Sequence, residues 1–293
     1  MTGLSSASRY DGIVSEAGLL PVNGIELYVE THRGPDVDPR TPPLLTLHGI
    51  GGHADAMGPE VLGLSGDRPV IAFDARGHGR STRPARYTLA DHVADAVGVV
   101  EALGVDRFAV LGVSMGSYVA PGVVVAASGR VAGLVLVVAK GHGAESSSAR
   151  LMRERPELFA GRTAEEVAQA MFEIVISPQT TAAERQALAE RLAPLARPEL
   201  TLGPEEFQRA NDALAGFDNR PLFPRIGCPT LVVSARDDAL NPPVDGEAVA
   251  AAIPGARFEV VERAGHILTA ERTAEYLALV RPFLRQLDEL PQD

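Results

Sequence analysis

Apolar runs along the 293-residue chain mark out a series of predicted strands. Residues 25–32 alternate apolar and polar side chains, which predicts an early antiparallel strand with one face in solvent. Residues 131–138 are apolar throughout, as in parallel strands that are buried on both faces. Shorter runs that also indicate strands lie at residues 44–47, 70–73, 108–111, 230–233 and 257–261.

Predicted helices alternate with these strands. Residues 89–103 carry apolar side chains at helical spacing and are followed by Gly104, a typical helix stop. A further helix is expected over residues 271–287. Strands that alternate with helices predict an α/β fold with a parallel sheet.

The pattern changes between residues 140 and 220, where Ala, Glu, Arg and Gln dominate. Helical periodicity is found at residues 163–176, 181–193 and 204–215, and no strand is expected in this region. We therefore predict an α/β core made of residues 1–139 and 221–293. Residues 140–220 should form a helical cap, or lid, inserted after the sixth strand of the core.

Composition excludes several function classes. A hydrophobic content of 45% can form a sizeable core, and a net charge of −11 argues against nucleic-acid binding and a polybasic membrane anchor. Residues 1–10 lack the pattern of a signal peptide, and the apolar runs are too short to span a bilayer. We expect a cytoplasmic protein without membrane attachment, either a monomer or a homodimer.

Cysteine and histidine spacing gives no sign of a metal site. The single cysteine, Cys228, excludes an internal disulfide, and its position at the start of an apolar strand favours a small buried residue over a reactive thiol. We expect neither a metal nor an organic cofactor.

The strongest chemical signal is Gly-Val-Ser-Met-Gly-Ser at residues 112–117, between a predicted strand and a small-residue helix. This is the context of a nucleophile elbow, in which a serine stands on a tight turn. Glycines at 112 and 116 leave room for that turn, and the helix start brings backbone N–H groups close to Ser114. A glycine-rich turn with an incidental serine is the alternative.

A serine nucleophile needs a base and an acid that orients the base. His266 follows the last strand, and it is the histidine that comes after a suitable acid in the chain order Ser, acid, His. Asp237 and Asp238 stand side by side after the preceding strand. If Ala235 takes the turn position, the spacing favours Asp238 as the acid.

Two glycine-rich loops follow other strands. The loop His-Gly-Ile-Gly-Gly at 48–52 can turn the N–H of Ile50 toward the serine, and with the N–H of Met115 it would form an oxyanion hole. His48 is expected to brace this loop rather than to act in catalysis. Residues 73–81 lack the Gly-Lys-Ser/Thr of a phosphate loop, so a buried turn is expected there.

In this order, these motifs resemble the α/β-hydrolase superfamily. The resemblance covers roughly residues 20–138 and 222–288 and is strongest to the esterase and 3-oxoadipate enol-lactonase branch, which shares the segments at 87–91 and 103–107. Ser117 departs from that branch, in which glycine is usual. The resemblance implies a mostly parallel eight-stranded sheet flanked by helices, with a cap that sets specificity.

The resemblance also implies a reaction. Serine at 114 argues against haloalkane dehalogenases and epoxide hydrolases, whose nucleophile is a carboxylate, and residues 73–81 lack the pattern of carbon–carbon bond hydrolases. A small-molecule ester or lactone is the expected substrate, cleaved by Ser114, His266 and Asp238. An acyltransferase, a perhydrolase or a non-hydrolytic biosynthetic enzyme on this scaffold is an alternative, and a non-catalytic binding protein is a more remote one.

Candidate substrate contacts lie in the insertion. Phe159, Met171 and Phe172 are the apolar candidates for the pocket wall, within a larger set of residues expected mostly to form the interior of the cap: Met152, Phe159, Met171, Phe172, Phe207 and Phe217. Three arginines, Arg150, Arg153 and Arg155, could meet a substrate carboxylate, although a solvated helix face is the stronger interpretation.

Overall fold

The strands of the core form one sheet in the computed structural model, which describes residues 4–6, 12–193 and 197–289. The sheet has the order β1-β2-β3-β5-β4-β6-β7-β10-β11. Its strands are β1 (Ser5–Ser6), β2 (Val14–Val22), β3 (Ile25–Arg33), β4 (Leu44–Leu47), β5 (Val70–Phe73), β6 (Phe108–Val113), β7 (Val131–Val137), β10 (Thr230–Ala235) and β11 (Arg257–Val261). Residues 1–3 and 7–11 lie outside the described residues. They include most of residues 1–10, the segment that lacks the pattern of a signal peptide.

Strand direction divides the sheet into two parts. Strands β5, β4, β6, β7, β10 and β11 run parallel to one another, whereas β1, β2 and β3 join antiparallel. The predicted mostly parallel α/β fold is confirmed, with eight strands of four or more residues and the two-residue β1 in the described chain. The pattern did not reveal β2, since Ser15 is buried on the face opposite Leu20 and Val22, and Gly18 and Pro21 interrupt its sequence.

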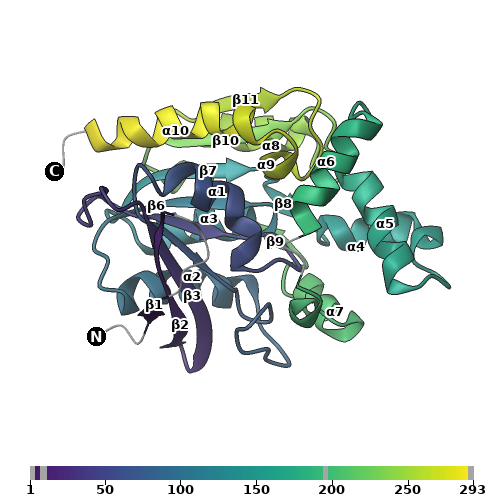
Figure 1. The fold of residues 1–293 in the computed structure, drawn as a ribbon, viewed down its shortest axis with the longest axis horizontal. Coiled ribbons are helices and arrows are strands. Elements are labelled where there is room, and N and C mark those ends of the chain that lie inside the picture. The colour runs from purple at the N-terminus through teal and green to yellow at the C-terminus, as the bar shows by residue number, and fades with distance from the viewer. Residues whose placement is uncertain (1–3, 7–11, 194–196, 290–293) are drawn as a thin grey trace.

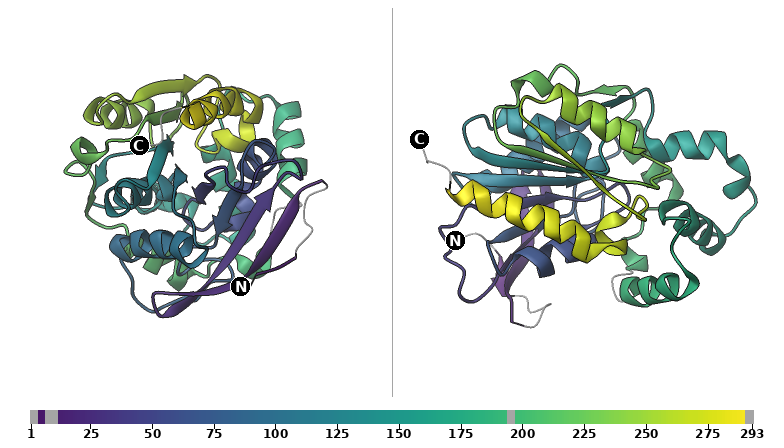
Figure 2. Two further views of the ribbon diagram at one scale, coloured as in Figure 1. Left: turned by 90° about the vertical axis from the view of Figure 1, so that its left-hand side faces the viewer. Right: turned by 90° about the horizontal axis from the view of Figure 1, so that it is seen from above.

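Helices cover both faces of the sheet, as Figures 1 and 2 show. Alternate residues of one strand belong to different hydrophobic clusters: Val110 lies in the first, and Ala109 and Leu111 lie in the second. The first cluster includes side chains of α2 (Leu89–Ala102), α3 (Met115–Ala126) and α8 (Pro243–Ala252), and the second includes side chains of α1 (Gly58–Leu64), α9 (Leu268–Glu271) and α10 (Thr273–Glu289). Burial on both faces explains why these strands are apolar throughout.

Local sequence sets the ends of these helices. Thr88 and Asp91 form a reciprocal capping box at the start of α2, and Gly104 takes a φ of +68° just after it ends. The helix predicted from residue 271 begins later, because Arg272 has a non-helical φ of −129° and ψ of 52° and separates α9 from α10. Glu271, at the end of α9, accepts a hydrogen bond from Gly265 N at 2.7 Å.

Residues 140–220 fold mainly into helices in their described part, residues 140–193 and 197–220. The helices are α4 (Ser147–Glu154), α5 (Ala164–Val175), α6 (Ala182–Leu192) and α7 (Pro204–Asp212), with short 3₁₀ turns at Pro156–Leu158 and Pro198–Leu200. The expectation of no strand here is wrong in one detail: β8 (His142–Gly143) pairs antiparallel with β9 (Phe217–Asp218) and joins the two ends of the insertion.

The insertion lies at one end of the sheet. In Figure 1 helices α4 to α7 stand on the right, the side toward which the arrowheads of β7 and β10 point, and the right-hand view of Figure 2 agrees. The carboxyl ends of the parallel strands therefore face the insertion. Among the helices of residues 4–6, 12–193 and 197–289, none combines the length and the apolar character needed to cross a membrane.

Candidate active site

Ser114 stands on the turn between β6 and α3. Its backbone has a φ of 53° and a ψ of −114°, a region that residues other than glycine rarely occupy, and its N–H donates to Val137 O at 3.0 Å. A Cβ atom at Gly116 would lie 2.0 Å from Leu47 O, and one at Gly112 would lie 2.2 Å from Gly116 O. Only glycine fits at these two positions, so the sequence motif and the turn require each other.

A line of hydrogen bonds joins Ser114, His266 and Asp238. The Ser114 Oγ atom lies 2.9 Å from His266 Nε2, and His266 Nδ1 lies 2.8 Å and 3.0 Å from the two carboxylate oxygens of Asp238. An ionised carboxylate only accepts, so His266 carries its proton on Nδ1 and leaves Nε2 free to accept the serine hydroxyl. Both Asp238 and His266 are buried.

The topology of the sheet explains this convergence. Ser114 follows β6, Asp238 comes three residues after the end of β10, and His266 comes five residues after the end of β11. Because parallel strands end at the same edge of a sheet, residues 152 positions apart can meet there. Asp238 Oδ1 also accepts from the N–H groups of Leu240 and Asn241, at 2.8 Å and 2.9 Å, which fixes the carboxylate.

Asp237 faces away from His266. Its Oδ2 atom accepts from Ser177 Oγ at 2.5 Å and from Gln179 Nε2 at 2.9 Å, both in the insertion. Of the two neighbouring aspartates, only Asp238 lies against the histidine, as the spacing argument had favoured. Sequence reasoning gave no role to the partners of Asp237.

The loop after β4 lies against the serine. A Cβ atom at Gly49 would be 3.4 Å from Ser114 Cβ, and Ile50 follows directly. His48 Nε2 accepts from Ala75 N at 3.0 Å, so its Nδ1 carries the proton and donates to Gly49 O at 2.7 Å. Burial lowers the pKa of His48, which keeps the ring neutral. His48 therefore braces the loop that holds Ile50, while Met115 begins α3 directly after the serine.

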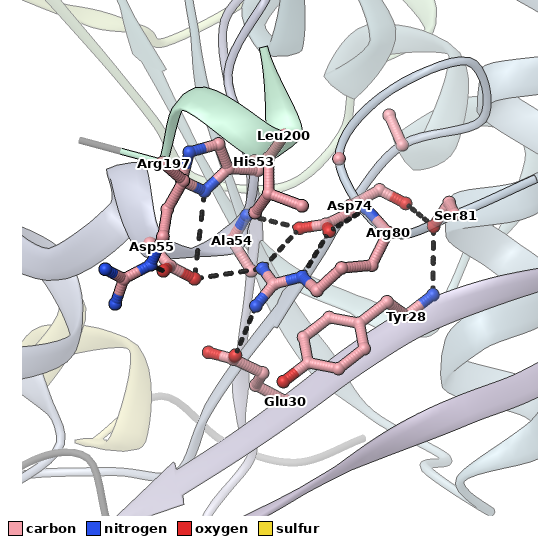
Figure 3. A network of polar contacts seen from close by, with 12 residues as sticks. Tyr28, Glu30, His53, Ala54, Asp55, Asp74, Arg80, Ser81, Arg197 and Leu200 are labelled. Carbon is pink, nitrogen blue, oxygen red and sulfur yellow. Dashed lines mark hydrogen bonds and ion pairs between the residues drawn. The ribbon is translucent and has the colours of Figure 1, made fainter. Parts of the chain in front are cut away.

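Residues 73–81 form a buried turn, as expected. Figure 3 shows Asp74 at its centre: its carboxylate accepts from the backbone N–H groups of Ala54 and Arg80, at 2.6 Å and 2.7 Å. The Arg80 guanidinium stacks 3.7 Å from the centre of the Tyr28 ring and donates to Asp74 and Asp55. Asp55 also accepts from Arg197 Nε of the insertion at 3.2 Å. This network ties the segment after the Ile50 loop to the core and to the insertion.

Asn241 is a residue whose role sequence reasoning missed. Its amide donates to Val138 O at 2.6 Å and to the Tyr118 hydroxyl at 2.8 Å, and its Oδ1 accepts from Ser147 Oγ at 2.5 Å. Burial raises the pKa of Tyr118 to about 12. Asn241 thus joins the loop of Asp238 to the end of β7, to α3 and to α4. An Asn-Pro-Pro run three residues after the acid was visible in the sequence but pointed to no partner.

The candidate pocket residues of the insertion occupy varied places. Phe159, Met171 and Phe172 are partly exposed and belong to neither hydrophobic cluster. Phe207, on α7, lies against the Ile50 loop, since a Cβ atom at Gly51 would be 3.5 Å from its ring. Phe217 is buried in the core and stacks on Tyr118 with ring centres 4.5 Å apart.

The three arginines considered for a substrate carboxylate all bond to the protein. Arg150 Nη2 donates to Leu240 O at 2.7 Å. Arg153 pairs with Glu145 at 2.6 Å, and Arg155 pairs with Glu157 at 2.5 Å. Arg153 and Arg155 are exposed, which agrees with the interpretation of a solvated helix face.

The fold and this arrangement of residues place the chain among the α/β hydrolases. A sequence model described as the alpha/beta hydrolase fold matches residues 42–273, and the chain belongs to that family. The resemblance drawn from the motifs is thereby confirmed. Membership of this family, together with the relatives described next, supports hydrolase activity.

Relatives and solved structures agree with this assignment. The chain is 30% identical to a putative carbamate hydrolase, RutD, of Cronobacter sakazakii over 86% of this chain and 94% of that protein. It is also 30% identical to a 2-hydroxymuconate semialdehyde hydrolase of Pseudomonas putida, over 85% of this chain and 89% of that protein. The enol-lactonase of Burkholderia xenovorans superposes with a TM-score of 0.77 at 25% identity, covering 92% of this chain and all of that one.

Proposed function

We propose that this protein is a serine hydrolase that cleaves a small carboxylic ester or lactone through an acyl-enzyme. The observation that carries the proposal is the hydrogen-bonded line from Ser114 through His266 to Asp238, with distances of 2.9 Å and 2.8 Å. Serine, histidine and aspartate in this geometry are the components of a catalytic triad. The position of Ser114 on a strained turn between strand and helix supports the same role.

The proposed reaction has two stages. The Ser114 oxygen attacks the substrate carbonyl carbon while His266 Nε2 accepts the hydroxyl proton, and His266 then returns that proton to the departing alcohol. Water, deprotonated by His266, next attacks the acyl-enzyme and releases the acid and the free serine. Asp238 keeps the proton of the imidazole on Nδ1 and stabilises the positive charge that develops on the ring.

The developing oxyanion needs hydrogen-bond donors. We assign this role to the backbone N–H groups of Ile50 and Met115, because the Ile50 loop lies against Ser114 and Met115 begins the helix that follows it. The brace from His48 holds the loop before substrate arrives, and preorganised donors of this kind usually supply the largest single part of the rate enhancement.

Residues 140–220 act, in this proposal, as a cap on a core made of residues 1–139 and 221–293. Its described helices stand at the carboxyl ends of the strands, where the serine, histidine and aspartate meet. The contact of Phe207 with Gly51 brings one apolar side chain of the cap to the oxyanion loop. A cap in this place excludes water and shapes the acyl pocket.

The test is a substrate panel with wild type and Ser114→Ala. The panel contains p-nitrophenyl esters of graded chain length and several lactones, and the variant should lose turnover by several orders of magnitude while keeping the wild-type melting temperature. A variant that keeps more than about a tenth of the wild-type kcat would contradict the role of Ser114. Labelling of the wild type, and not of the variant, by a fluorophosphonate probe provides an independent measure of the nucleophile.

Carbamate hydrolysis is a second candidate, favoured by the relatives named putative carbamate hydrolase. The same serine, histidine and oxyanion donors would attack a carbamate carbonyl. The panel therefore includes a carbamate and 2-hydroxymuconate semialdehyde beside the esters, and an alcohol and hydrogen peroxide as competing acceptors. Higher kcat/KM on the carbamate, or transfer to an acceptor in preference to water, would replace ester hydrolysis as the function.

A further inference from the structure

The segment between α5 and α6 of the insertion docks on the two loops that carry Asp238 and His266. It spans residues 176–181, and its Ser177 is fully buried, with 0% of its surface exposed. A buried serine must satisfy both its hydroxyl and its backbone N–H. Ser177 does so with two different carboxylates: Asp237 on the loop of Asp238, and Glu271 at the end of α9, just after the loop of His266.

The Ser177 hydroxyl is bound to the acid loop. Its Oγ atom donates to Asp237 Oδ2 at 2.5 Å and accepts from Gln179 N at 3.1 Å. Asp237 N in turn donates to Ala264 O at 2.9 Å, which ties the acid loop to the histidine loop. Ser177 therefore fixes Asp237, the residue directly before Asp238.

The Ser177 backbone is bound to the histidine loop through Glu271. The carboxylate of Glu271 accepts from Ser177 N at 3.0 Å with one oxygen and from Gly265 N at 2.7 Å with the other. The hydroxyl of Thr180 also donates to this carboxylate. Because Glu271 is buried, with 8% exposed, these charge-assisted hydrogen bonds are little weakened by solvent. Glu271 therefore fixes the residue directly before His266.

Backbone packing closes the same contact. Ile267 N donates to Val175 O at 3.3 Å, and a Cβ atom at Gly265 would lie 2.3 Å from that carbonyl oxygen. The insertion backbone thus presses on the histidine loop so closely that only glycine fits at 265. On the two sides of His266, Gly265 packs against the insertion and Ile267 is hydrogen-bonded to it.

We propose that Ser177, acting with Asp237 and Glu271, is a positioning residue that sets the separation of Asp238 and His266. We call these three residues the Ser177 clamp. The inference rests on the proposed function and deepens it, because it makes the insertion part of the catalytic geometry as well as a cover for the pocket. The hydrogen bonds of Ser177, Asp237 and Glu271 described above go to groups other than Ser114, so the clamp acts through the neighbouring residues Asp238 and His266.

The kinetic test uses Ser177→Ala, Asp237→Ala and the double variant on the best ester of the panel. A displacement of about 1 Å can reduce a rate about 100-fold, so each single variant should lower kcat about 10- to 100-fold with KM within about twofold of wild type. The double variant should lose no more than the larger single loss, because both substitutions remove the same bond. Asp237→Asn keeps an oxygen that can accept from Ser177 and should recover most of the kcat lost in Asp237→Ala.

Ser148→Ala is the matched control, since it removes another buried hydroxyl of the insertion, one that donates to Asn211 at 3.2 Å and not to a catalytic loop. It should lower the melting temperature as much as Ser177→Ala does and leave kcat unchanged. Equal kcat losses in both variants, or additive losses in the double variant, would overturn the clamp. If Ser177→Ala fails to fold, the pair Asp237→Ala and Asp237→Asn decides the question.

A proton NMR measurement separates failure of the clamp from failure of the proposed function. The His266 Nδ1 proton, identified as the low-field signal that His266→Ala removes, reports the bond to Asp238 without any substrate. The clamp predicts that Ser177→Ala broadens this signal or moves it upfield, and an unchanged signal overturns the clamp. A wild type that shows the signal but no Ser114-dependent turnover would overturn the proposed function alone.

Discussion

The carboxylates of Asp237 and Asp238 face different partners although the residues are neighbours in the chain. Asp238 accepts from His266 Nδ1 at 2.8 Å, and Asp237 accepts from the hydroxyl of Ser177 at 2.5 Å. One aspartate is thus directed to the core histidine and the other to the insertion. One loop therefore positions both the histidine of the core and the adjoining segment of the insertion.

Substitution of the two aspartates by asparagine should separate these roles. Asp238→Asn should lower kcat about 10³- to 10⁴-fold, because His266 would adopt the wrong tautomer. Asp237→Asn should lower it less than about tenfold, since the amide oxygen still accepts from Ser177. Steady-state kinetics on one ester compare the two variants directly, and the reverse ranking would transfer the role of orienting acid to Asp237.

Truncation of apolar residues in the insertion should change substrate preference more than stability. Phe159, Met171 and Phe172 are partly exposed and lie outside the hydrophobic clusters, so Ala at these positions should alter kcat/KM across an ester series by about 1–3 kcal/mol in transition-state binding. Phe207→Ala should act in the same way, because its ring lies against Gly51. The buried Phe217 provides the contrast.

Phe217→Ala should instead destabilise the protein by about 3–5 kcal/mol, as expected for a core phenylalanine. Thermal melts of all five variants, recorded beside the ester series, make the comparison. Lower melting temperatures with an unchanged chain-length profile in Phe159→Ala, Met171→Ala and Phe172→Ala would show that these residues form the interior of the insertion. The pocket wall would then have to be sought elsewhere.

Glu60 should make stability depend on pH. Its side chain is fully buried on α1 beside Tyr276, and burial raises its pKa to about 7. A raised folded-state pKa means that the folded chain holds the proton more tightly than the unfolded chain, whose ordinary value is 4.5. The contribution of Glu60 to the free energy of unfolding is therefore complete below about pH 4.5. It is lost as pH rises to about 7, which lowers the free energy of unfolding by about 3 kcal/mol.

Urea unfolding of wild type and Glu60→Gln from pH 4.5 to 8 tests this linkage. A glutamine stays neutral, so the variant should gain about 3 kcal/mol relative to wild type across that range. Glu247→Gln, on an exposed position of α8, serves as the matched control. A constant difference between Glu60→Gln and wild type at all pH values would show that Glu60 does not titrate in this window.

A methyl group at Gly265 should disturb the contact between the histidine loop and the insertion. Gly265→Ala places a Cβ atom 2.3 Å from Val175 O, and relief of that overlap should lower the free energy of unfolding by about 1–3 kcal/mol. Gly227→Ala is the control, because nothing lies within 4 Å of the added Cβ atom. Equal melting temperatures for the two variants would mean that the backbone approach at Gly265 carries no stability.

Much of the core could be predicted because its physical causes are local. Strands buried on both faces must be apolar throughout, and a serine on a tight turn requires glycines at fixed spacing, so β7 and residues 112–117 were readable directly. The alternation of β3 was also readable, whereas its partner β2 was not, because Ser15 is buried in a hydrogen bond with His32 at 2.9 Å, on the face opposite Leu20 and Val22. Patterns fail where polar side chains are buried in pairs.

The contacts of the insertion could not be predicted for a related reason. Ser177 binds Asp237 and Glu271 across 60 and 94 positions of sequence, and a single serine carries no sign of either partner. The break between α9 and α10 at Arg272 was hidden by a continuous helical pattern. Long-range hydrogen bonds of this kind depend on the assembled fold, which periodicity and spacing do not contain.

The backbone of Ser114 also limits which nucleophiles this position could ever hold. At a φ of 53°, a side chain branched at Cβ collides with its own backbone, so threonine is disfavoured there although its hydroxyl would be equally reactive. Cysteine and aspartate are unbranched at Cβ and can adopt the same turn. The turn therefore has room for serine, cysteine or aspartate at position 114. A single substitution there could change the type of nucleophile, and with it the type of reaction, without a steric conflict.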